Sequence, residues 1–128
     1  MLSSAALLCL ALNIYHEARG EPIQGQNAIA HVVINRVKHP AYPDDVCTVV
    51  YQEGQFSWVR QRPRKPKGPA WEQAKSVAFK ALICESKDPT WGATHFHTIH
   101  VKPKWSYRLK RVKTIKNHVF YKLPPKKG

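Results

Sequence analysis

Two glutamates, Glu17 and Glu21, stand four residues apart in the stretch "IYHEARGEPIQG". Glu17 falls where an apolar, alanine- and leucine-rich run ends, because Gly20 and Pro22 prevent that run from continuing as a helix. The exposed carbonyls of a last helical turn disfavour an ionised carboxylate and raise its pKa, and burial among apolar groups acts in the same direction. A carboxyl group that keeps its proton near neutral pH can serve as a general acid.

The two glutamates are not equivalent. Most glutamates at helix ends make a structural hydrogen bond or a surface salt bridge, and that reading competes with catalysis for Glu17. Glu21 lies beyond the glycine and before the proline, so we expect it to tie the turn to Arg19, Arg36 or a backbone amide. Because the chain kinks between the glutamates, we do not expect the carboxylate pair of a retaining glycosidase. Glu17 is the candidate acid, with Arg19 pointing elsewhere.

The residues around these glutamates predict a mostly helical body. Apolar positions favour helices in four segments: residues 3–18, residues 24–38, a short stretch within "YPDDVCTVVYQ", and residues 70–86. Ser3 or Ser4 can cap the first helix, and Asp44 the short third one. Residues 60–69 contain five cations and three prolines, which indicates a solvated loop over or beside a cleft.

The last third of the chain has a different pattern. The runs "THFHTIHV" and "HVFYKL" are short, alternating or aromatic, and they predict strands. We expect residues 123–128 to form a frayed basic tail. The fold class is therefore α+β, mostly helical, with a small β-rich C-terminal part, and residues 1–128 form one domain large enough to bury a core.

The net charge indicates which partners the protein favours, and the cysteines indicate the compartment in which it is made. The chain holds 21 Lys and Arg against 8 Asp and Glu, a net charge of +13, which favours anionic partners such as nucleic acid, anionic lipid or bacterial envelope polymers. Cys9, Cys47 and Cys84 stand singly among apolar residues without a CxxC pair. We expect reduced core thiols and synthesis in a reducing compartment.

The first residues, "MLSSAALLCLALNIY", are apolar but do not match a cleaved secretory signal well. The first cation is Arg19, so a basic n-region is missing, and the run leads directly into the polar motif. The run is also too short for a membrane span. We therefore interpret it as a buried helix.

A family resemblance joins these segments. The ordered pieces "ALNIYHEARGEP", "GQNAIAHVVINRV", "YPDDVCTVVYQ" and "QFSW" resemble the cell-wall hydrolase family that includes spore cortex-lytic enzymes. The likeness continues in "AWEQAKSVAFKAL", "PTWGATHFHT" and "KNHVFY", and it spans roughly residues 8–122. The EARGEP and NRV pieces, taken as an ordered pair, are the most specific.

The resemblance implies a compact, lysozyme-like catalytic domain that acts on the glycan strands of peptidoglycan. In that family the first glutamate of the motif, here Glu17, is the catalytic acid, and characterised relatives resemble lytic transglycosylases, which leave a 1,6-anhydro-muramyl end. A bare, basic catalytic domain resembles a bacteriophage endolysin. Such a protein is made in the host cytoplasm, released by a holin, and acts on the cell wall.

The carboxylate inventory favours a transglycosylase over a hydrolytic muramidase of the same fold. A hydrolase normally needs a second carboxylate to stabilise the oxocarbenium centre or to activate water. Asp44 and Asp45 look like caps, and Asp88 precedes a proline in a turn. Glu72 and Glu85 lie on or near the polar face of the predicted helix 70–86, and Glu21 and Glu53 remain as outsiders. A transglycosylase avoids the shortage, because the muramyl N-acetyl group and C6 hydroxyl supply those functions within the substrate.

Polar and aromatic side chains are expected to line the cleft and hold sugar rings. "GQFSW" is the first choice, since amide and hydroxyl groups bind sugar hydroxyls and aromatic rings stack on sugar faces. The candidate substrate-binding residues are Gln55, Phe56, Ser57, Trp58, Tyr15, His95, His97, Trp105 and Tyr121. Each aromatic residue taken singly can instead be core.

Two other classes of protein compete. "HFHTIH" and His16–Glu17 suggest a zinc peptidase, but the second histidine of HExxH is replaced by Gly20. Ten cations in residues 102–127, interleaved with aromatic residues, suggest a nucleic-acid-binding module, but they fit no known signature. We expect no metal, no cofactor and no nucleic acid. We expect a monomer whose basic surface is drawn to the anionic bacterial envelope.

Overall fold

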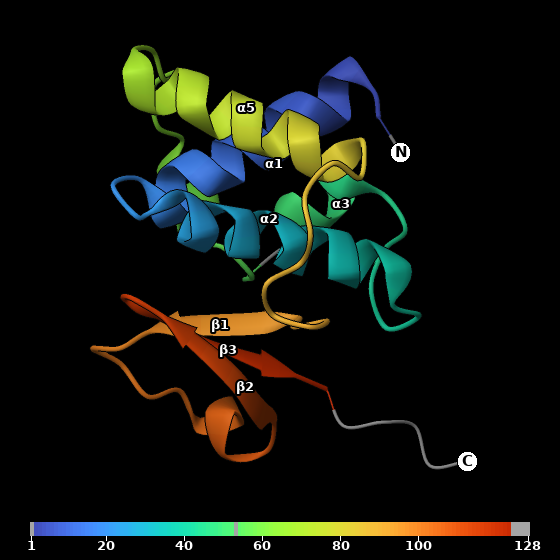
Figure 1. Cartoon of the computed structure of the whole chain (residues 1–128), viewed down its shortest axis with the longest axis vertical. Helices are drawn as coiled ribbons and strands as arrows, with labels where there is room; N and C mark the ends of the chain where they lie inside the picture. The colour runs from blue at the N-terminus through green and yellow to red at the C-terminus, as the bar shows by residue number, and fades with distance from the viewer. Residues whose placement is uncertain (1, 53, 124–128) are drawn as a thin grey trace.

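The computed structural model describes residues 2–52 and 54–123. Residues 124–128, most of the predicted frayed tail, lie outside the described residues. The elements in chain order are α1 (Ser4–Ala18), α2 (Ile23–Lys38), α3 (Val46–Val50), α4 (Trp58–Gln61), α5 (Pro69–Leu82), β1 (His95–Thr98), the 3-10 helix η1 (Lys104–Tyr107), β2 (Lys110–Ile115) and β3 (His118–Lys122). The predicted fold class, α+β and mostly helical with a small C-terminal sheet, is confirmed (Figure 1).

Helix α1 begins and ends where the sequence predicts. The Ser3 hydroxyl caps it by accepting a hydrogen bond from the Ala6 amide at 3.0 Å. Gly20 takes a φ of +85°, and the Glu21 amide donates to the Ala18 carbonyl at 3.0 Å, which closes the helix. Within the described part of the chain, no helix combines the length and apolar character that a membrane span requires.

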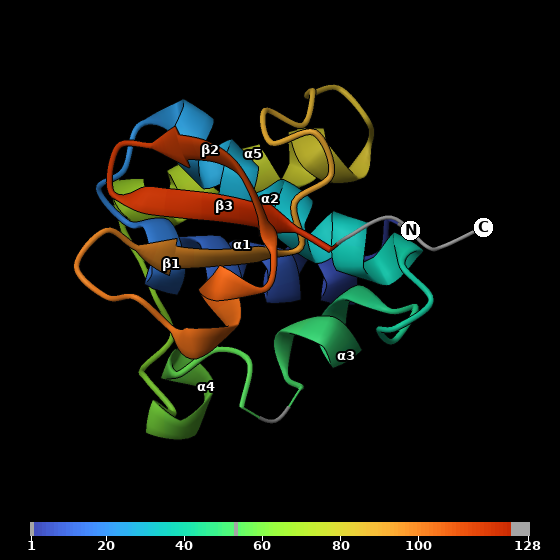
Figure 2. The same cartoon turned by 90° about the horizontal axis from the view of Figure 1, so that it is seen from below.

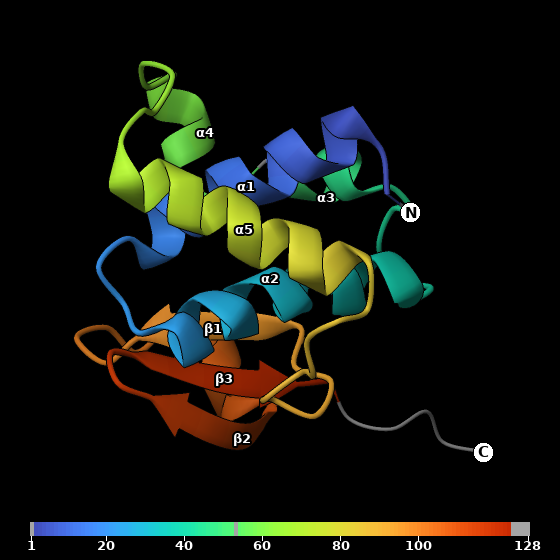
Figure 3. The ribbon, with the colours of Figure 1, turned by 45° about the horizontal axis from the view of Figure 1, so that its top comes forward.

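Helix α2 is the centre of the molecule. It packs against α1 and α5 on one side, and the sheet lies on its other side (Figures 1 and 3). Ile29, Val32 and Val33 are fully buried, because neighbouring elements cover α2 on both sides. Helix α5 is shorter than the predicted 70–86, since Cys84 adopts a left-handed φ of 62° that a helix cannot continue through.

The sheet is antiparallel in the order β1-β3-β2, as Figure 2 shows from the side of its outer face. Strand β3 is central, and its Phe120 ring lies 5.9 Å from that of Phe96 on β1, facing the helices. The strands predicted in "THFHTIHV" and "HVFYKL" are present. Strand β2 was not predicted, because an edge strand reading "KRVKTI" buries few apolar side chains and lacks the usual alternation.

The segment between α2 and α5 differs from the prediction in two ways. Asp45, not Asp44, caps α3: its carboxylate accepts hydrogen bonds from the Thr48 amide at 3.0 Å and the Thr48 hydroxyl at 2.9 Å. The predicted loop 60–69 overlaps the end of the short helix α4, which forms because Trp58 is buried. Residues 62–67 have no regular structure, as expected.

Cys9 and Cys47 form a disulfide that joins α1 to α3, with the two Cα atoms 5.3 Å apart. The expectation of three reduced core thiols is therefore wrong. Cys84 is the free thiol among them, and it is exposed. The two bonded cysteines are 38 residues apart in sequence, and only the packing of α3 against α1 brings them together. Such a bond persists in an oxidising compartment.

Replacing both bonded cysteines by serine should lower the free energy of unfolding by about 3–4 kcal/mol, because the bond closes a 38-residue loop in the unfolded chain. Urea unfolding of Cys9→Ser/Cys47→Ser beside the wild type measures this difference, and added reductant should bring the wild type to the same value. Cys84→Ser is the matched control and should change stability by less than about 0.5 kcal/mol. Equal stability of all three proteins would show that the bond is absent in solution.

Candidate active site

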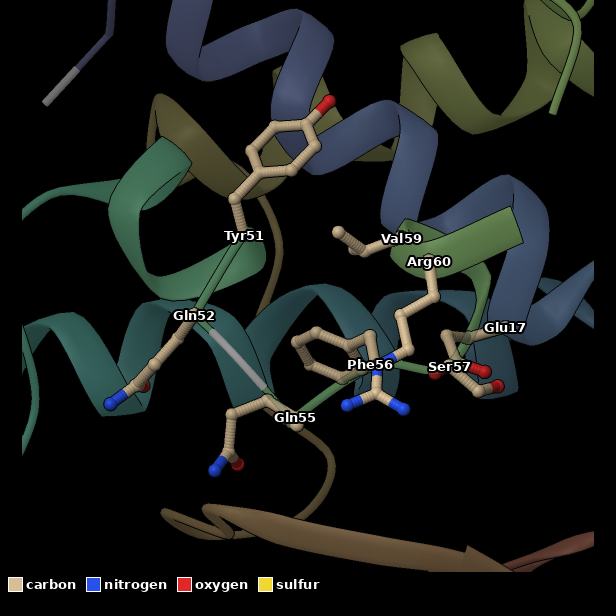
Figure 4. Close-up of a pocket in the computed structure, with 9 residues that line it drawn as sticks. Glu17, Tyr51, Gln52, Gln55, Phe56, Ser57, Val59 and Arg60 are labelled. Atoms are coloured by element: carbon tan, nitrogen blue, oxygen red, sulfur yellow. The ribbon is translucent and has the colours of Figure 1, made fainter. Parts of the chain in front are cut away.

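Glu17 lies in a cavity of about 550 Å³ between α1 and the segment from Tyr51 to Arg60. The last turn of α1 supplies Glu17. The chain from the end of α3 into α4 supplies the other lining residues: Tyr51, Gln52, Gly54, Gln55, Phe56, Ser57, Val59 and Arg60. Figure 4 shows Glu17 entering the pocket on the side opposite Tyr51 and Gln52. One carboxyl group therefore faces a wall of amide, hydroxyl and guanidinium groups.

The protonation of Glu17 is set by burial. Desolvation raises the pKa of its carboxyl group to about 7, while the positive charge of Arg36 acts in the opposite direction. Arg19 does turn away, as expected, and its guanidinium lies 4.8 Å from the centre of the Tyr15 ring. At neutral pH about half of the Glu17 side chains carry a proton, which is the state that an acid catalyst requires.

Arg36 connects α2 to the pocket segment and to the chain just before β1. Its Nε donates to the Thr94 carbonyl at 2.7 Å, and its Nη1 donates to Gln55 Oε1 at 3.1 Å. The guanidinium also lies 5.2 Å from the centres of the Tyr42 and Phe56 rings. Although the side chain is only 4% exposed, these partners satisfy much of its charge and hydrogen-bonding capacity. Arg36 thereby fixes two pocket residues, Gln55 and Phe56.

Glu21 has a different role from the one expected. Its carboxylate accepts a hydrogen bond from Asn117 Nδ2 at 3.0 Å and lies 3.1 Å from His118 Nδ1, with the side chains of the Glu21–His118 pair almost completely buried. The expected partners Arg19, Arg36 and a backbone amide are not used, because the C-terminal sheet folds over the turn. Burial lowers the pKa of His118, and hydrogen bonding to Glu21 opposes that shift. The pair anchors the end of α1 to β3.

The "GQFSW" residues divide into two groups. Gln55, Phe56 and Ser57 line the Glu17 pocket, although the Phe56 side chain is 4% exposed and its ring stacks against Phe96 at 6.2 Å. Trp58 is a core residue outside that pocket. Its indole Nε1 donates to Asn13 Oδ1 at 2.8 Å, which leaves its ring unavailable for stacking on a sugar beside Glu17.

The other predicted binding residues do not line the Glu17 pocket. Four of them gather around the outer face of the sheet: His95, His97, Trp105 and Tyr121. The centre of the Trp105 ring lies 5.0 Å from that of His95, 5.8 Å from that of His97 and 5.4 Å from that of Tyr121. His97 Nε2 lies 2.8 Å from the Tyr121 hydroxyl. Tyr15 packs edge-on against Trp71 at 6.1 Å. The structure brings the first four together with one another, and none of them lines the Glu17 pocket.

Four pocket residues were not predicted from the sequence: Tyr51, Gln52, Val59 and Arg60. Gln52 could have been predicted, since it ends the "YPDDVCTVVYQ" piece of the family resemblance. Arg60 was instead grouped with the cations of the predicted loop. Gln52 Oε1 is buried without a hydrogen-bond partner among the described residues. A buried acceptor without a donor at a pocket wall is suited to a ligand hydroxyl or amide.

His95, one of the histidines that suggested a zinc site, lies against neighbouring hydroxyl groups. Burial lowers the pKa of His95 to about 4, and its ring nitrogens lie 2.9 Å from the Thr94 hydroxyl and 3.4 Å from the Tyr42 hydroxyl. Among residues 2–52 and 54–123, no three His, Cys, Asp or Glu side chains are grouped so that they could hold a metal ion.

Comparison with known proteins identifies relatives of this arrangement. The sequence pattern of the family described as Cell Wall Hydrolase matches residues 20–121, a range that begins three residues after Glu17. The spore cortex-lytic enzymes of Halalkalibacterium halodurans and Bacillus subtilis are each 32% identical over 114 residues, which is 87% of this chain and 33% and 35% of theirs. The chain thus spans about a third of the length of these curated relatives.

Two solved structures resemble the chain over nearly its whole length. The catalytic domain of the Bacillus cereus SleB protein superposes with a TM-score of 0.83 at 29% identity, covering 95% of this chain and 93% of that one. The catalytic domain of the germination-specific lytic transglycosylase SleB from Bacillus anthracis gives a TM-score of 0.82 at 31% identity, covering 94% and 97%. The helical body and the small sheet are thus shared.

The raised pKa of Glu17 predicts how stability depends on pH. The folded protein holds a Glu17 proton that the unfolded chain releases, so the contribution of Glu17 to the free energy of unfolding should fall as pH rises from about 4.5 to about 7. His95, whose pKa is lowered to about 4, contributes in the opposite direction over a similar pH range. Glu17→Gln removes the Glu17 contribution and keeps that of His95, so the difference between the two proteins isolates Glu17. The variant should match the wild type near pH 4 and exceed it by about 1–3 kcal/mol at pH 8, a range reduced because the carboxyl group is partly exposed. Urea unfolding at both pH values measures the difference, and a constant difference would contradict the assigned burial.

Proposed function

This chain belongs to the cell wall hydrolase family, and on that premise we propose that it cleaves the β-1,4 glycosidic bond between N-acetylmuramic acid and N-acetylglucosamine in peptidoglycan, as a lytic transglycosylase. The observation that carries the proposal is Glu17, the first glutamate of the family motif, whose pKa is raised to about 7 at the edge of a cavity of about 550 Å³. The likeness to a catalytic domain named as a lytic transglycosylase supports the reaction type.

In the first step Glu17 donates its proton to the oxygen that bridges the two sugars. The bond between that oxygen and C1 of the muramyl residue then breaks, and the bonding electrons leave with the oxygen as a neutral hydroxyl group. Positive charge develops at C1 as in other glycosidases. Because about half of Glu17 is protonated at neutral pH, the acid is available without a large free-energy cost.

The second step must neutralise C1 and is where a hydrolase would need another carboxylate. Among the described residues, Glu17 is the one carboxylate that lines the cavity. Glu21 is held by His118 and Asn117, Asp45 caps α3, and Asp88 accepts hydrogen bonds from the Thr90 and Gly92 amides. The substrate therefore supplies the missing groups: its N-acetyl oxygen stabilises C1, and its C6 hydroxyl attacks C1 while Glu17, now ionised, takes the hydroxyl proton. The product is a 1,6-anhydro-muramyl end, and Glu17 is regenerated as an acid.

The remaining pocket groups suit a sugar chain. Gln52, Gln55 and Ser57 present amide and hydroxyl groups of the kind that bind hydroxyls and acetamides, and Gln55 is held in place by Arg36. The buried Oε1 of Gln52, which has no donor within the described residues, accepts a hydroxyl or an acetamide N–H of the substrate in this arrangement.

The biological role is the more specific part of the proposal. We propose a role in host-cell lysis, as an endolysin that passes a holin, because a strongly basic catalytic domain resembles such enzymes. Its site of action, outside the cytoplasmic membrane, agrees with the Cys9–Cys47 disulfide, which persists in an oxidising compartment. The basic surface then serves to hold the enzyme on an anionic envelope, with no nucleic acid involved.

Glu17→Gln should abolish clearing of purified peptidoglycan, because glutamine cannot transfer a proton to the leaving oxygen. The expected loss in kcat is at least about 10²–10⁴-fold. Mass spectrometry of the wild-type digest should find 1,6-anhydro-muramyl ends, which are lighter than reducing muramyl ends by the mass of one water. Reducing muramyl ends would instead establish the hydrolytic muramidase of the same fold.

Glu72→Gln provides the matched control. Glu72 is an exposed residue of α5 that pairs with Lys75 at 2.9 Å, and its side chain is 67% exposed. The same loss of charge at this position should leave clearing within about twofold of wild type. Full activity of Glu17→Gln, with this control also active, would remove the basis of the proposal.

The dependence of kcat/KM on pH follows from the same carboxyl group. The acid form of Glu17 is lost as pH rises through about 7, so kcat/KM on soluble glycan fragments should fall above that value, approaching tenfold per pH unit. Initial rates at constant ionic strength between pH 5 and 9 measure the profile. A flat profile to pH 9 would contradict Glu17 as the proton donor.

A further inference from the structure

A second groove lies beside the Glu17 pocket and has different chemistry. Its volume is about 360 Å³, and its floor is apolar, formed by Leu8, Leu12, Trp58 and Trp71. Leu8 is 45% exposed, whereas Leu10 and Ile14 of the same helix are fully buried. An exposed apolar side chain at the edge of a groove is suited to contact with apolar groups of a ligand.

The groove adjoins the active site. Tyr51 and Val59 line both the Glu17 pocket and this groove, so their side chains form the wall between them. Figure 4 shows Tyr51 and Val59 on one side of the pocket, with Tyr51 turned away from Gln52. Tyr51 is 46% exposed, which makes the wall accessible from solvent. A substrate that occupies the Glu17 pocket therefore has this groove within reach of any branch it carries.

The lining of the groove is also cationic. It includes Arg62, Arg64 and Lys65, all of which are exposed. The sequence from Gly54 to Trp71 contains no acidic residue, and none of the described lining residues is a carboxylate. Among the described residues, no salt bridge involves these three cations. Their field favours an anionic group in the groove.

We propose that this groove binds the stem peptide that peptidoglycan carries on the lactyl group of its muramyl residue. This inference rests on the proposed function, which places a muramyl residue next to Glu17. A stem peptide combines carboxylates with alanine methyl groups, and the groove combines cations with an apolar floor. The contact places the stem of the reacting muramyl residue, or of its neighbour, against Arg62, Arg64 and Lys65.

The residues that line the groove suit a peptide better than a sugar. The described lining of the groove contains no Asn, Gln, Ser or Thr side chain, whereas the Glu17 pocket has Gln52, Gln55 and Ser57. Sugar sites need such groups to pair with ring hydroxyls. The groove instead suits a ligand whose polar groups are charged and whose remaining surface is methyl-rich. The two cavities thus divide one branched substrate into a glycan part and a peptide part.

The decisive experiment compares two soluble substrates: glycan strands that carry their stem peptides, and the same strands after an amidase has removed the stems. Wild-type kcat/KM should be roughly five- to tenfold higher on the stem-bearing strands, since several exposed ion pairs act together. In the variant Arg62→Gln/Arg64→Gln/Lys65→Gln this ratio should fall to about one. Stem-bearing strands whose carboxylates have been amidated should behave as stem-free strands with the wild type.

The matched control removes the same charges elsewhere. Arg108→Gln/Lys110→Gln/Arg111→Gln also replaces two arginines and one lysine, all exposed, on the C-terminal sheet region. Because it does not touch the groove, it should keep the wild-type ratio even if general attraction to the substrate weakens. A ratio that falls equally in both variants would show a general charge effect and would overturn the proposal.

Failure of this inference is distinct from failure of the proposed function. A wild-type ratio of one, or an equal loss on both substrates in the groove variant, would overturn stem binding and leave the glycosidase intact. If the wild type cleaves neither substrate, the proposed function fails, and a binding measurement then tests whether the groove takes a stem peptide. For that case, NMR of the Glu17→Gln protein with a muramyl tripeptide should shift the indole N–H of Trp71, and no shift would overturn the groove assignment.

Discussion

The burial of one carboxyl group is the constraint on which the site depends. Glu17 lies in the last turn of α1, and desolvation raises its pKa to about 7 even though the buried guanidinium of Arg36 acts against that shift. In a chain with a net charge of +13, an exposed glutamate would meet cations on most sides and stay ionised. A proton donor can therefore exist here only if the fold shields the carboxyl group from water and keeps Arg19 away from it.

That shielding requires elements from all parts of the chain. The disulfide joins α1 to α3 and so fixes the helix that carries Glu17 to the start of the pocket segment. Arg36 connects α2 to Gln55 and to the Thr94 carbonyl before β1. The Glu21–His118 pair attaches the turn after α1 to β3. These connections hold the pocket from three directions, and each is a covalent bond or a buried polar contact, which tolerates little displacement.

Charged groups inside the protein and on its surface are treated differently. Two buried ionisable groups near the site have partners: Glu21 has His118 and Asn117, and Arg36 has backbone, amide and aromatic contacts. The exposed cations of residues 60–67 and of the C-terminal sheet have few acidic neighbours in sequence, because no Asp or Glu follows Asp88. The protein therefore combines locally neutralised charge inside with a strong positive field outside, which suits work on an anionic polymer.

The sequence by itself determined the main helices, two of the strands and the candidate acid. Capping, helix-terminating and apolar patterns are local, so they predicted α1, α2 and α5 to within a few residues and placed Glu17 at a helix end with a raised pKa. Only the tertiary structure decided which distant residues meet. It paired Cys9 with Cys47 and Glu21 with His118, buried Trp58 away from the pocket, added Gln52 and Arg60 to it, and gathered His95, His97, Trp105 and Tyr121 elsewhere. The physical reason is that propensity and capping act within a few residues of sequence, whereas contacts between side chains depend on how whole helices and strands pack.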